Sequence, residues 1–322
     1  MRQIVRSCIL AGLAGLAALP SLAQQPTFPT PIRLIVPFGA GAQTDGLARV
    51  VAAQLGPRLG TTVIVENRVG ASGLIGASAV AKGPRDGSML LFHSSSLVTT
   101  AATVAKMPFD VSVDLIPVAI VANGPMIVGI SAKSGITTPA GLVTAARANP
   151  NGLKASSSGV GTVGHLAAEL LNESAKTQMM HVPYKGASQA VVDLSAGIVD
   201  MLVGSYSTLA PQLKAGRIIP VAVTSAQPHP AFPGIPTMAS AANGYTSGIW
   251  YGVFAPAGLS MPALQRLNRE INEISQSPEL MALLNADGAT PPMLALVKAD
   301  QFVKDDYMVW KRLAIEKHIV AE

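Results

Sequence analysis

Short runs of β-branched and aliphatic residues alternate with amphipathic helical segments, and this alternation constrains the fold more than any other feature of the 322-residue chain. In the first third of the chain, strands are expected at residues 32–36, 62–66 and 89–92, with helical segments between them. Thr44 or Asp45 is the expected N-cap of the first helix. A strand-helix-strand-helix-strand order predicts a parallel sheet with right-handed crossovers.

The same alternation is repeated in the middle of the chain. A strand at residues 218–223 is expected to return toward the first unit, and the tail from Pro262 onward is expected to be mostly helical. Between these, the pattern predicts strands at 126–130, 153–157, 179–182 and 199–203, and helices at 139–148, 187–196 and 209–215.

Two α/β units, with the second inserted into the first, would be joined by two crossings, which we expect near residues 121–124 and 224–226. The sequence therefore predicts a lobe 1 made of residues 24–123 and 226–322, and a lobe 2 made of residues 124–225. Ligands of open α/β sheets bind beyond the carboxyl ends of the strands, so the expected binding site is a cleft between the two lobes.

Residues 1–23 have the pattern of a secretory signal peptide. Arg2 and Arg6 precede an apolar stretch at residues 8–19, which is too short to span a bilayer. Ser21-Leu22-Ala23 is a small-x-small cleavage site. Cleavage after Ala23 would remove Cys8, the only cysteine. We therefore expect an exported, periplasmic protein that folds without disulfides.

Composition excludes several classes of partner. Charged residues make up 13% of the chain and hydrophobic residues 49%, which predicts a folded protein rather than a disordered one. Aromatic residues make up only 4%, and the lysines and arginines form no run, so no nucleic acid is expected. The five histidines show no metal-site spacing, and the G-x-G-x-x-G at 159–164 lacks the acidic residue of a dinucleotide site. No cofactor or metal is expected.

Three glycine-rich turns, at residues 38–42, 70–73 and 159–164, each stand between an expected strand and an expected helix. The first N–H groups of a helix have no partner within the helix, and the helix dipole favours an anion there. Glycine also lets the backbone approach a ligand closely. The three turns therefore predict a site for a small carboxylate made largely of main-chain donors, with plain tight turns as the alternative.

Several side chains beside these turns have two interpretations. His165 either donates a hydrogen bond to a ligand or has a structural role. Asp45 is either an ordinary first-turn acid, or it orders the first loop or receives the ammonium group of an amino acid. The serines at 94–96 and 156–158 either bind a ligand or fill turns. Lys185 either pairs with an anion or is solvated.

A series of short motifs in a fixed order resembles one family. The motifs include PIRLIVPF at residues 31–38, VENR at 65–68, G-T-x-x-H-L-A at 161–167 and HVPYKG at 181–186. Together they resemble the Bug/TctC family, the extracytoplasmic solute receptors of tripartite tricarboxylate transporters. The resemblance implies a type II periplasmic-binding-protein fold, a small carboxylate ligand (a dicarboxylate, an acidic amino acid or an aromatic acid) and delivery of that ligand to a membrane permease.

By position, the resemblance and the turns place ligand contacts on both units. Gly39-Ala40 stands where the family usually has Pro-Pro, and Val69 where Pro is usual, so the first loop is expected to admit a larger acid such as an aromatic dicarboxylate. The candidate contacts are Phe38, Gly39, Ala40, Gly41, Ala42, Asp45, Ser72, Ser94, Ser95, Gly161, Thr162, His165, Tyr184 and Asp200.

The sequence therefore favours a monomeric binding protein without a catalytic set. Two alternatives stay open at this point. One is a periplasmic ligand sensor that signals to a sensor kinase. The other is an exported hydrolase or isomerase that uses His165 and a serine.

Overall fold

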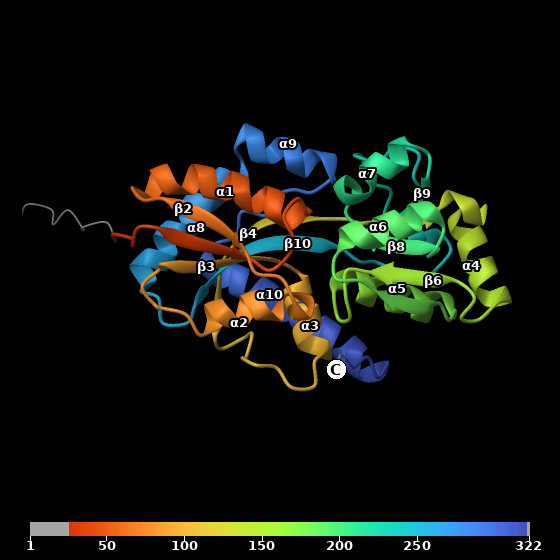
Figure 1. The fold of residues 1–322 in the computed structure, drawn as a ribbon, viewed down its shortest axis with the longest axis horizontal. Coiled ribbons are helices and arrows are strands. Elements are labelled where there is room, and N and C mark those ends of the chain that lie inside the picture. Colours follow the sequence, from red (N-terminus) through yellow and green to blue (C-terminus); the bar gives the residue numbers. More distant parts are fainter. Residues whose placement is uncertain (1–25, 321–322) are drawn as a thin grey trace, which may run out of the picture.

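Lobe 1 is built on a five-stranded sheet with the strand order β2-β1-β3-β10-β4. The computed structural model describes residues 26–320 and places this lobe beside a second lobe of similar build (Figure 1). Strands β1, β2 and β3 run parallel, whereas β10 runs antiparallel to both of its neighbours. The strands are β1 (Ile32–Val36), β2 (Val63–Asn67), β3 (Met89–Ser94), β4 (Leu115–Gly124) and β10 (Ile249–Pro256).

Helices cover both faces of this sheet, and β1 shows why. Ile32 and Leu34 pack with α1 (Gln43–Leu59) and α8 (Met261–Ser275), whereas Ile35 belongs to the core on the other face. Successive side chains of a strand point to opposite faces, so an almost continuous apolar run requires cover on both. That other face is covered by α2 (Leu74–Ala81), α3 (Ser96–Thr103) and α10 (Leu296–Glu316), while α9 (Pro278–Ala286) contacts α1.

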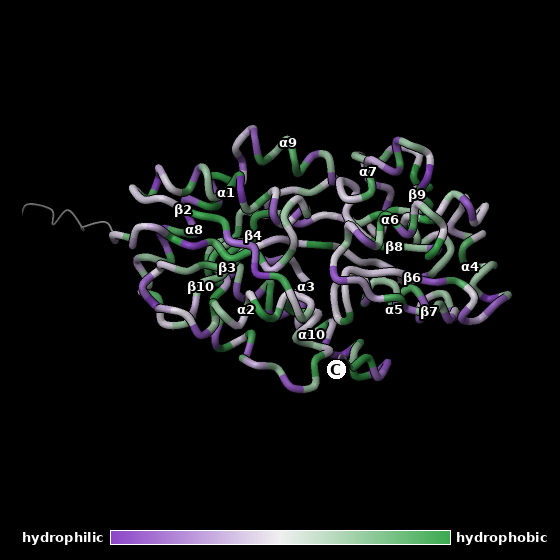
Figure 2. Tube along the Cα trace, in the orientation of Figure 1, coloured by the Kyte–Doolittle hydropathy of each residue, from purple (hydrophilic) through white to green (hydrophobic). Residues whose placement is uncertain are grey.

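Lobe 2 repeats this arrangement with the strand order β7-β6-β8-β5-β9. Here β6 pairs in parallel with β7 and β8, and β5 runs antiparallel to β8 and β9. Hydrophobic segments run through the strands at the centre of each lobe (Figure 2). The elements are β5 (Ile127–Ser131), β6 (Lys154–Ser157), β7 (Met180–Pro183), β8 (Met201–Gly204), β9 (Ile218–Val223), α4 (Pro139–Ala148), α5 (Val163–Ala175), α6 (Ala187–Ala196) and α7 (Tyr206–Lys214).

The chain passes between the lobes at two places, and the second differs from the prediction. The first lies at residues 125–126, between β4 and β5. The second was expected at 224–226, but Val223 forms a parallel bridge with Thr237, and Phe232 packs in the core of lobe 2. Residues 226–245 therefore stay with lobe 2, and the chain returns at residues 246–248. For the same reason β9 is an edge strand of lobe 2 and does not return to the first unit.

Two local expectations are also corrected. The N-cap of α1 is Ala42, so the assignment of Thr44 or Asp45 to that position is wrong. The serines at 94–96 were expected to end a strand. Ser94 does end β3, but Ser96 is already the first residue of α3. The expected signal peptide and its cleavage site lie outside the described residues. Within residues 26–320, no helix has the length and apolar character needed to cross a membrane.

Candidate functional site

A cavity of about 610 Å³ lies between the two lobes. Lobe 1 contributes the loop after β1 and the end of β3, and lobe 2 contributes the starts of α5, α6 and α7. Five of the predicted contact residues line this cavity: Phe38, Gly39, Gly41, Ala42 and Ser94. We call this cavity the cleft.

Helix N-termini from both lobes meet at the cleft. Gln43 and Thr44, in the first turn of α1, line it, and no side chain caps this helix. Across the cleft, Ala187 and Ser188 begin α6, whose N-cap is Gly186 and which also has no side-chain cap. Uncapped first-turn N–H groups are free to donate, and each helix dipole adds partial positive charge. The cleft is therefore suited to an anion.

Asp45 orders the loop that forms the lobe 1 wall. Its carboxylate is 3% exposed and accepts hydrogen bonds from Gly41 N (3.0 Å), Asn67 Nδ2 (2.9 Å) and Arg49 Nε (2.9 Å). Burial alone would raise the pKa of Asp45, but these hydrogen bonds and the Arg49 charge outweigh it and lower the pKa. Because its acceptor capacity is directed to the protein, the geometry supports a role for Asp45 in ordering the loop.

A third helix N-terminus at the cleft is occupied by the protein itself. The Asp287 carboxylate, from the segment after α9, accepts hydrogen bonds from Ser207 N (2.6 Å) and Ser207 Oγ (2.9 Å) in the first turn of α7. It also accepts one from Gln43 Nε2 of α1, so it joins the two lobes. Burial raises the pKa of Asp287. Because α7 is occupied in this way, and because Val163 N at the start of α5 donates to Ser96 Oγ, we take α1 and α6 as the N-termini that remain for a bound anion.

The lobes are in direct contact beside the cleft, and several predicted residues lie in this contact. Ser72 Oγ of lobe 1 donates to Val160 O of lobe 2 (2.8 Å), and Ser96 Oγ accepts from Val163 N at the start of α5 (3.2 Å). Gly161, with φ +79°, lies so close to Thr103 that a side chain would clash with it. Ser72 and Gly161 therefore join the lobes, and Thr162 is fully buried with its hydroxyl donating to Gly159 O, so none of the three lines the cleft.

His165 lies in the same contact region, not in the cleft wall. Its Nδ1 accepts a hydrogen bond from Gly161 N (3.1 Å), which assigns the proton to Nε2, and its ring stacks on His181 at 3.7 Å. Burial, and then the charge of His181, lower the pKa of His165 to about 3. The ring is neutral at pH 7, so its 3.7 Å approach to Glu169 is not an ion pair. Burial likewise lowers the pKa of His181 to about 4.

The other predicted residues lie away from the cleft wall. Tyr184 donates its hydroxyl to Asp193 (2.6 Å), and burial followed by that hydrogen bond raises the pKa of Tyr184 to about 12. Ser95 is buried, and Ala40 is exposed in the first loop. Asp200 is a clear correction, because it precedes β8 and accepts from Lys154 N (2.8 Å). That is the amino end of the strand, whereas the cleft is at the carboxyl ends.

Sequence reasoning missed much of the lobe 2 wall. The predicted glycine turn at 70–73 contributes only its neighbour Val69, and the second uncapped N-terminus comes instead from α6, after Gly186. Lys185, for which two interpretations were open, lines the cleft and is the single charged side chain among its described lining residues. Lys185-Gly186, directly before an expected helix, was the sequence feature that could have indicated this part of the cleft wall. Within residues 26–320, no group of His, Cys, Asp or Glu side chains could hold a metal ion.

Comparison with known proteins places this architecture in a family. A family model described as the tripartite tricarboxylate transporter family receptor, TctC, matches residues 47–319. The chain is 34% identical to protein BugT of Bordetella pertussis over 307 residues, which covers 94% of this chain and 93% of BugT. This chain therefore belongs to the TctC family of solute receptors, and the predicted resemblance is confirmed.

Solved structures agree with the fold. The chain is similar to Rpa4515 of R. palustris, solved with adipate, with a TM-score of 0.84 and 32% identity over 90% of this chain and 97% of that one. It is also similar to the periplasmic binding protein BugD, with a TM-score of 0.83 and 28% identity over 90% of this chain and 98% of that one. The predicted fold class, two α/β lobes of the periplasmic-binding-protein type, is confirmed.

Proposed function

We propose that this protein captures a small dicarboxylate in the cleft and delivers it to the membrane permease of a tripartite tricarboxylate transporter. The observation that carries the proposal is the meeting of uncapped helix N-termini from both lobes, α1 and α6, at a cleft whose single charged lining residue is Lys185. Two positive dipole ends and a lysine complement a ligand with two separated negative charges.

The walls between these polar groups favour a ligand with an apolar body. Val69, Val191, Leu202 and Ile249 line the cleft. An aliphatic or aromatic diacid would bury its carbon skeleton against them, as most small-molecule sites do. Adipate in the similar protein Rpa4515 is a diacid of this kind. Within the carboxylates, an acidic amino acid fits less well, because Asp45, the acid beside the first loop, already accepts three hydrogen bonds from the protein.

Thermal unfolding with and without ligand tests the proposal. Adipate and benzene-1,4-dicarboxylate are expected to raise the melting temperature by several degrees at a concentration of about 100 Kd, where binding adds about 2.7 kcal/mol. Aspartate and glucose at the same concentration are the controls, and each should raise the melting temperature less than the two diacids do. A shift with glucose and none with either diacid would overturn the proposed ligand class.

We also propose that the receptor binds its ligand without chemical turnover. Ser157 Oγ lies 2.7 Å from His181 Nε2, the kind of contact that a hydrolase would need. However, Ser157 is 1% exposed, donates to Gly159 O and does not line the cleft. Quantitative recovery of the unchanged diacid after prolonged incubation would support this proposal, and hydrolysis of an ester panel would refute it.

Export, oligomeric state and delivery complete the proposal. We propose a periplasmic monomer, released by cleavage after Ala23, that docks on the permease. Mass spectrometry of the protein from the periplasm and light scattering test the first two points. Diacid uptake by cells with and without this chain tests delivery, and unchanged uptake would favour the sensor alternative.

A further inference from the structure

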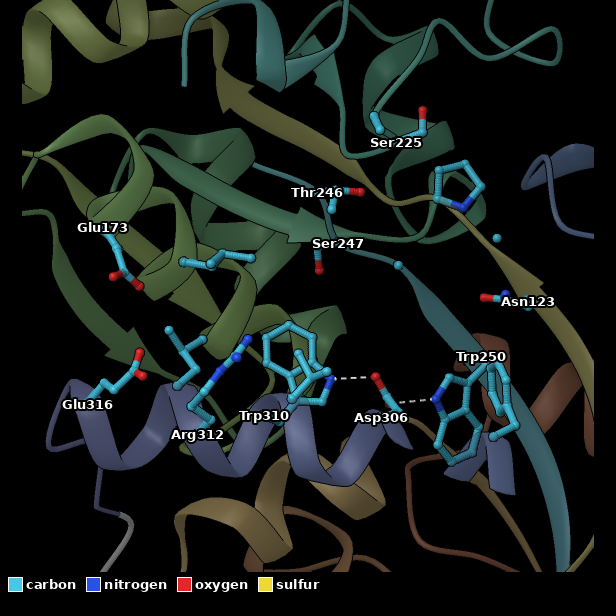
Figure 3. Close-up of a pocket in the computed structure, with 18 residues that line it drawn as sticks. Asn123, Glu173, Ser225, Thr246, Ser247, Trp250, Asp306, Trp310, Arg312 and Glu316 are labelled. Carbon is cyan, nitrogen blue, oxygen red and sulfur yellow. Dashed lines mark hydrogen bonds between the residues drawn. The ribbon is translucent and has the colours of Figure 1, made fainter. Parts of the chain in front are cut away.

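A second cavity, of about 690 Å³, lies on the other side of the segments that join the lobes (Figure 3). Its floor comes from the joining segments, including Gly124, Pro125 and Ser247. One wall is α10 of lobe 1, and the facing wall is the part of α5 that carries Leu170 and Glu173. We call this cavity the back pocket.

Strand geometry separates the back pocket from the cleft. Along β10, Ile249 and Tyr251 line the cleft, whereas Trp250, between them, lines the back pocket. The same division holds where the other chain segment crosses, with Pro125 on the back pocket and Met126 on the cleft. Alternate residues of an extended chain point to opposite faces. The two cavities are therefore distinct sites on opposite faces of the same strands.

The back pocket contains a carboxylate without a counter-cation. Asp306 accepts hydrogen bonds from Trp250 Nε1 (2.7 Å) and Trp310 Nε1 (2.9 Å), as Figure 3 shows. No Lys, Arg or His of residues 26–320 forms an ion pair with it. Both indoles are neutral donors, so the negative charge of Asp306 is solvated by hydrogen bonds but not neutralised. A partly buried carboxylate in this state is stabilised further by an added cation.

A second polar group in the pocket, the hydroxyl of Ser247, has no hydrogen-bond partner among the described residues. Ser247 Oγ is buried. In Figure 3 its hydroxyl points from the floor of the pocket toward the side on which Trp310 and Asp306 lie. An unsatisfied buried hydroxyl has a cost that a ligand donor or acceptor would remove.

The other charged residues of the pocket, Glu173, Arg312 and Glu316, lie on the side away from Trp250 (Figure 3). Glu173 forms an ion pair with Lys317 (3.0 Å), which links α5 of lobe 2 to the end of α10. Arg312 and Glu316 are exposed. Between these groups and Asp306, the lining is apolar and includes Leu170, Val309 and Leu313.

We propose that the back pocket is a second binding site, for a small organic cation with an apolar or aromatic body. The cation would pair with Asp306, and its body would lie against the apolar lining between α5 and α10. This site has the opposite charge preference to the cleft, and it does not depend on the ligand proposed for the cleft.

Calorimetric titration of the protein with phenethylamine, and with 2-phenylethanol as the matched neutral probe, tests the proposal. Phenethylamine is expected to bind at least about tenfold more tightly than 2-phenylethanol, because a hydrogen bond to a charged group is stronger than a neutral one. Equal affinity of the two probes, or no binding of phenethylamine at millimolar concentration, would overturn it.

Variants locate the binding. Asp306→Asn should weaken phenethylamine binding about tenfold or more, while Asp305→Asn, the same charge change at an exposed neighbour outside the pocket, should leave it within about twofold. Ser247→Leu, which fills the pocket and keeps Asp306, should also abolish binding. If Asp306→Asn lowers the melting temperature but binds phenethylamine normally, Asp306 only fixes the two indoles, and the proposal is wrong.

Discussion

The cleft and the back pocket lie on opposite faces of the same joining segments, yet they present charge in different ways. In the cleft, positive potential comes mainly from the backbone, through the first turns of α1 and α6, and Lys185 is the single charged side chain that residues 26–320 contribute to the lining. In the back pocket, negative potential comes from a side chain, Asp306, that two indoles hold in place. The two proposed sites therefore share one set of strands but differ in whether the main chain or a side chain supplies the charge.

Acidification should cause the largest change in stability, and most of it should come from histidines on the cleft side and in the lobe contact. Burial is the main cause of a lowered pKa at three histidines: His93, which packs against Phe38 of the cleft, and His165 and His181 in the lobe contact. Their pKa values are lowered to about 4, 3 and 4, respectively. A lowered pKa gives stability that is complete above pH 6.5 and is lost as the pH falls toward the folded-state value. For each of the three histidines, the folded state loses up to about 2 kcal/mol of stability between pH 6.5 and 5, and the contributions of the stacked His165 and His181 are coupled and do not simply add.

Two buried carboxyl groups, one on each face, should respond in the opposite direction. Burial raises the pKa of Asp306 in the back pocket and of Asp287 beside the cleft, so protonation of either group favours the folded state and offsets part of the loss. The free energy of unfolding in urea, measured at pH 7 and pH 5, gives the net effect of the histidines and the carboxyl groups. His181→Gln should remove part of the decrease, and stability that rises on acidification would contradict the neutral, buried state of the histidines.

Asp45 tests whether the backbone donors of the cleft depend on a side chain. Asp45→Ala removes three hydrogen bonds to a buried carboxylate, and we expect it to destabilise the protein by about 3 kcal/mol and to lower the melting temperature by about 6–12 °C. Asp305→Ala, at an exposed position on α10, is the control and should change stability by less than about 0.5 kcal/mol. Equal effects of the two variants would mean that the loop is ordered without Asp45.

Thr224 tests the strands that the two faces share. Its Oγ1 accepts from Met126 N (2.7 Å) and donates to Ser247 O (2.7 Å), so one hydroxyl joins both places where the chain passes between the lobes. Thr224→Val keeps the shape and leaves both backbone groups unsatisfied, at an expected cost of about 2 kcal/mol. A melting temperature unchanged within about 1 °C would show that water replaces the hydroxyl.

Lys185 tests how far the cleft relies on side-chain charge. Lys185→Gln should weaken adipate binding about tenfold, the effect of losing one charge-assisted hydrogen bond at a partly solvated site. Lys214→Gln, an exposed lysine outside the cleft, is the control. If Lys185→Gln binds adipate as the unchanged protein does, the helix N-termini alone hold the anion.

The smallest effect is expected at Ser247. Because its hydroxyl is buried without a partner, Ser247→Ala should leave stability unchanged or raise it by up to about 1 kcal/mol. Measured beside Thr224→Val, it compares an unsatisfied hydroxyl with a satisfied one on a residue that is hydrogen-bonded to the Ser247 backbone. A loss of more than about 1 kcal/mol would indicate a hydrogen bond that Ser247 makes in solution.

The hydrophobic periodicity of the sequence predicted the helices and strands whose formation depends mainly on neighbouring residues. The helices at Pro139–Ala148 and Ala187–Ala196 have the expected bounds, and the strand-helix order gave the right class of fold. The antiparallel strand β10 was not foreseen, because its partners β3 and β4 are far away in sequence and nothing local specifies them. The second passage between the lobes was misplaced for the same reason, since Thr237 pairs with Val223 across a long irregular segment.

The sequence predicted a cleft lined by a glycine-rich loop, but it did not predict most of the residues that line the lobe 2 wall. The first glycine loop lines the cleft as expected, because a loop at the carboxyl end of a central strand has few other places to go. The third glycine turn has the same local pattern, but its Gly161 is buried against Thr100 and Thr103 of the other lobe. Which uncapped N-terminus faces a ligand and which faces the protein depends on how the lobes meet, and that information is not local.

The position of β10 has a consequence for the order in which the protein is made. This strand is the only link in the described sheet between β3 and β4, and it follows the whole of lobe 2 in sequence. A ribosome must therefore add residue 256 before the first sheet can close, although its opening strand was synthesised more than two hundred residues earlier. Until then β3 and β4 lack the strand that lies between them, so the first sheet stays incomplete while all of lobe 2 is synthesised, which is compatible with the export proposed above.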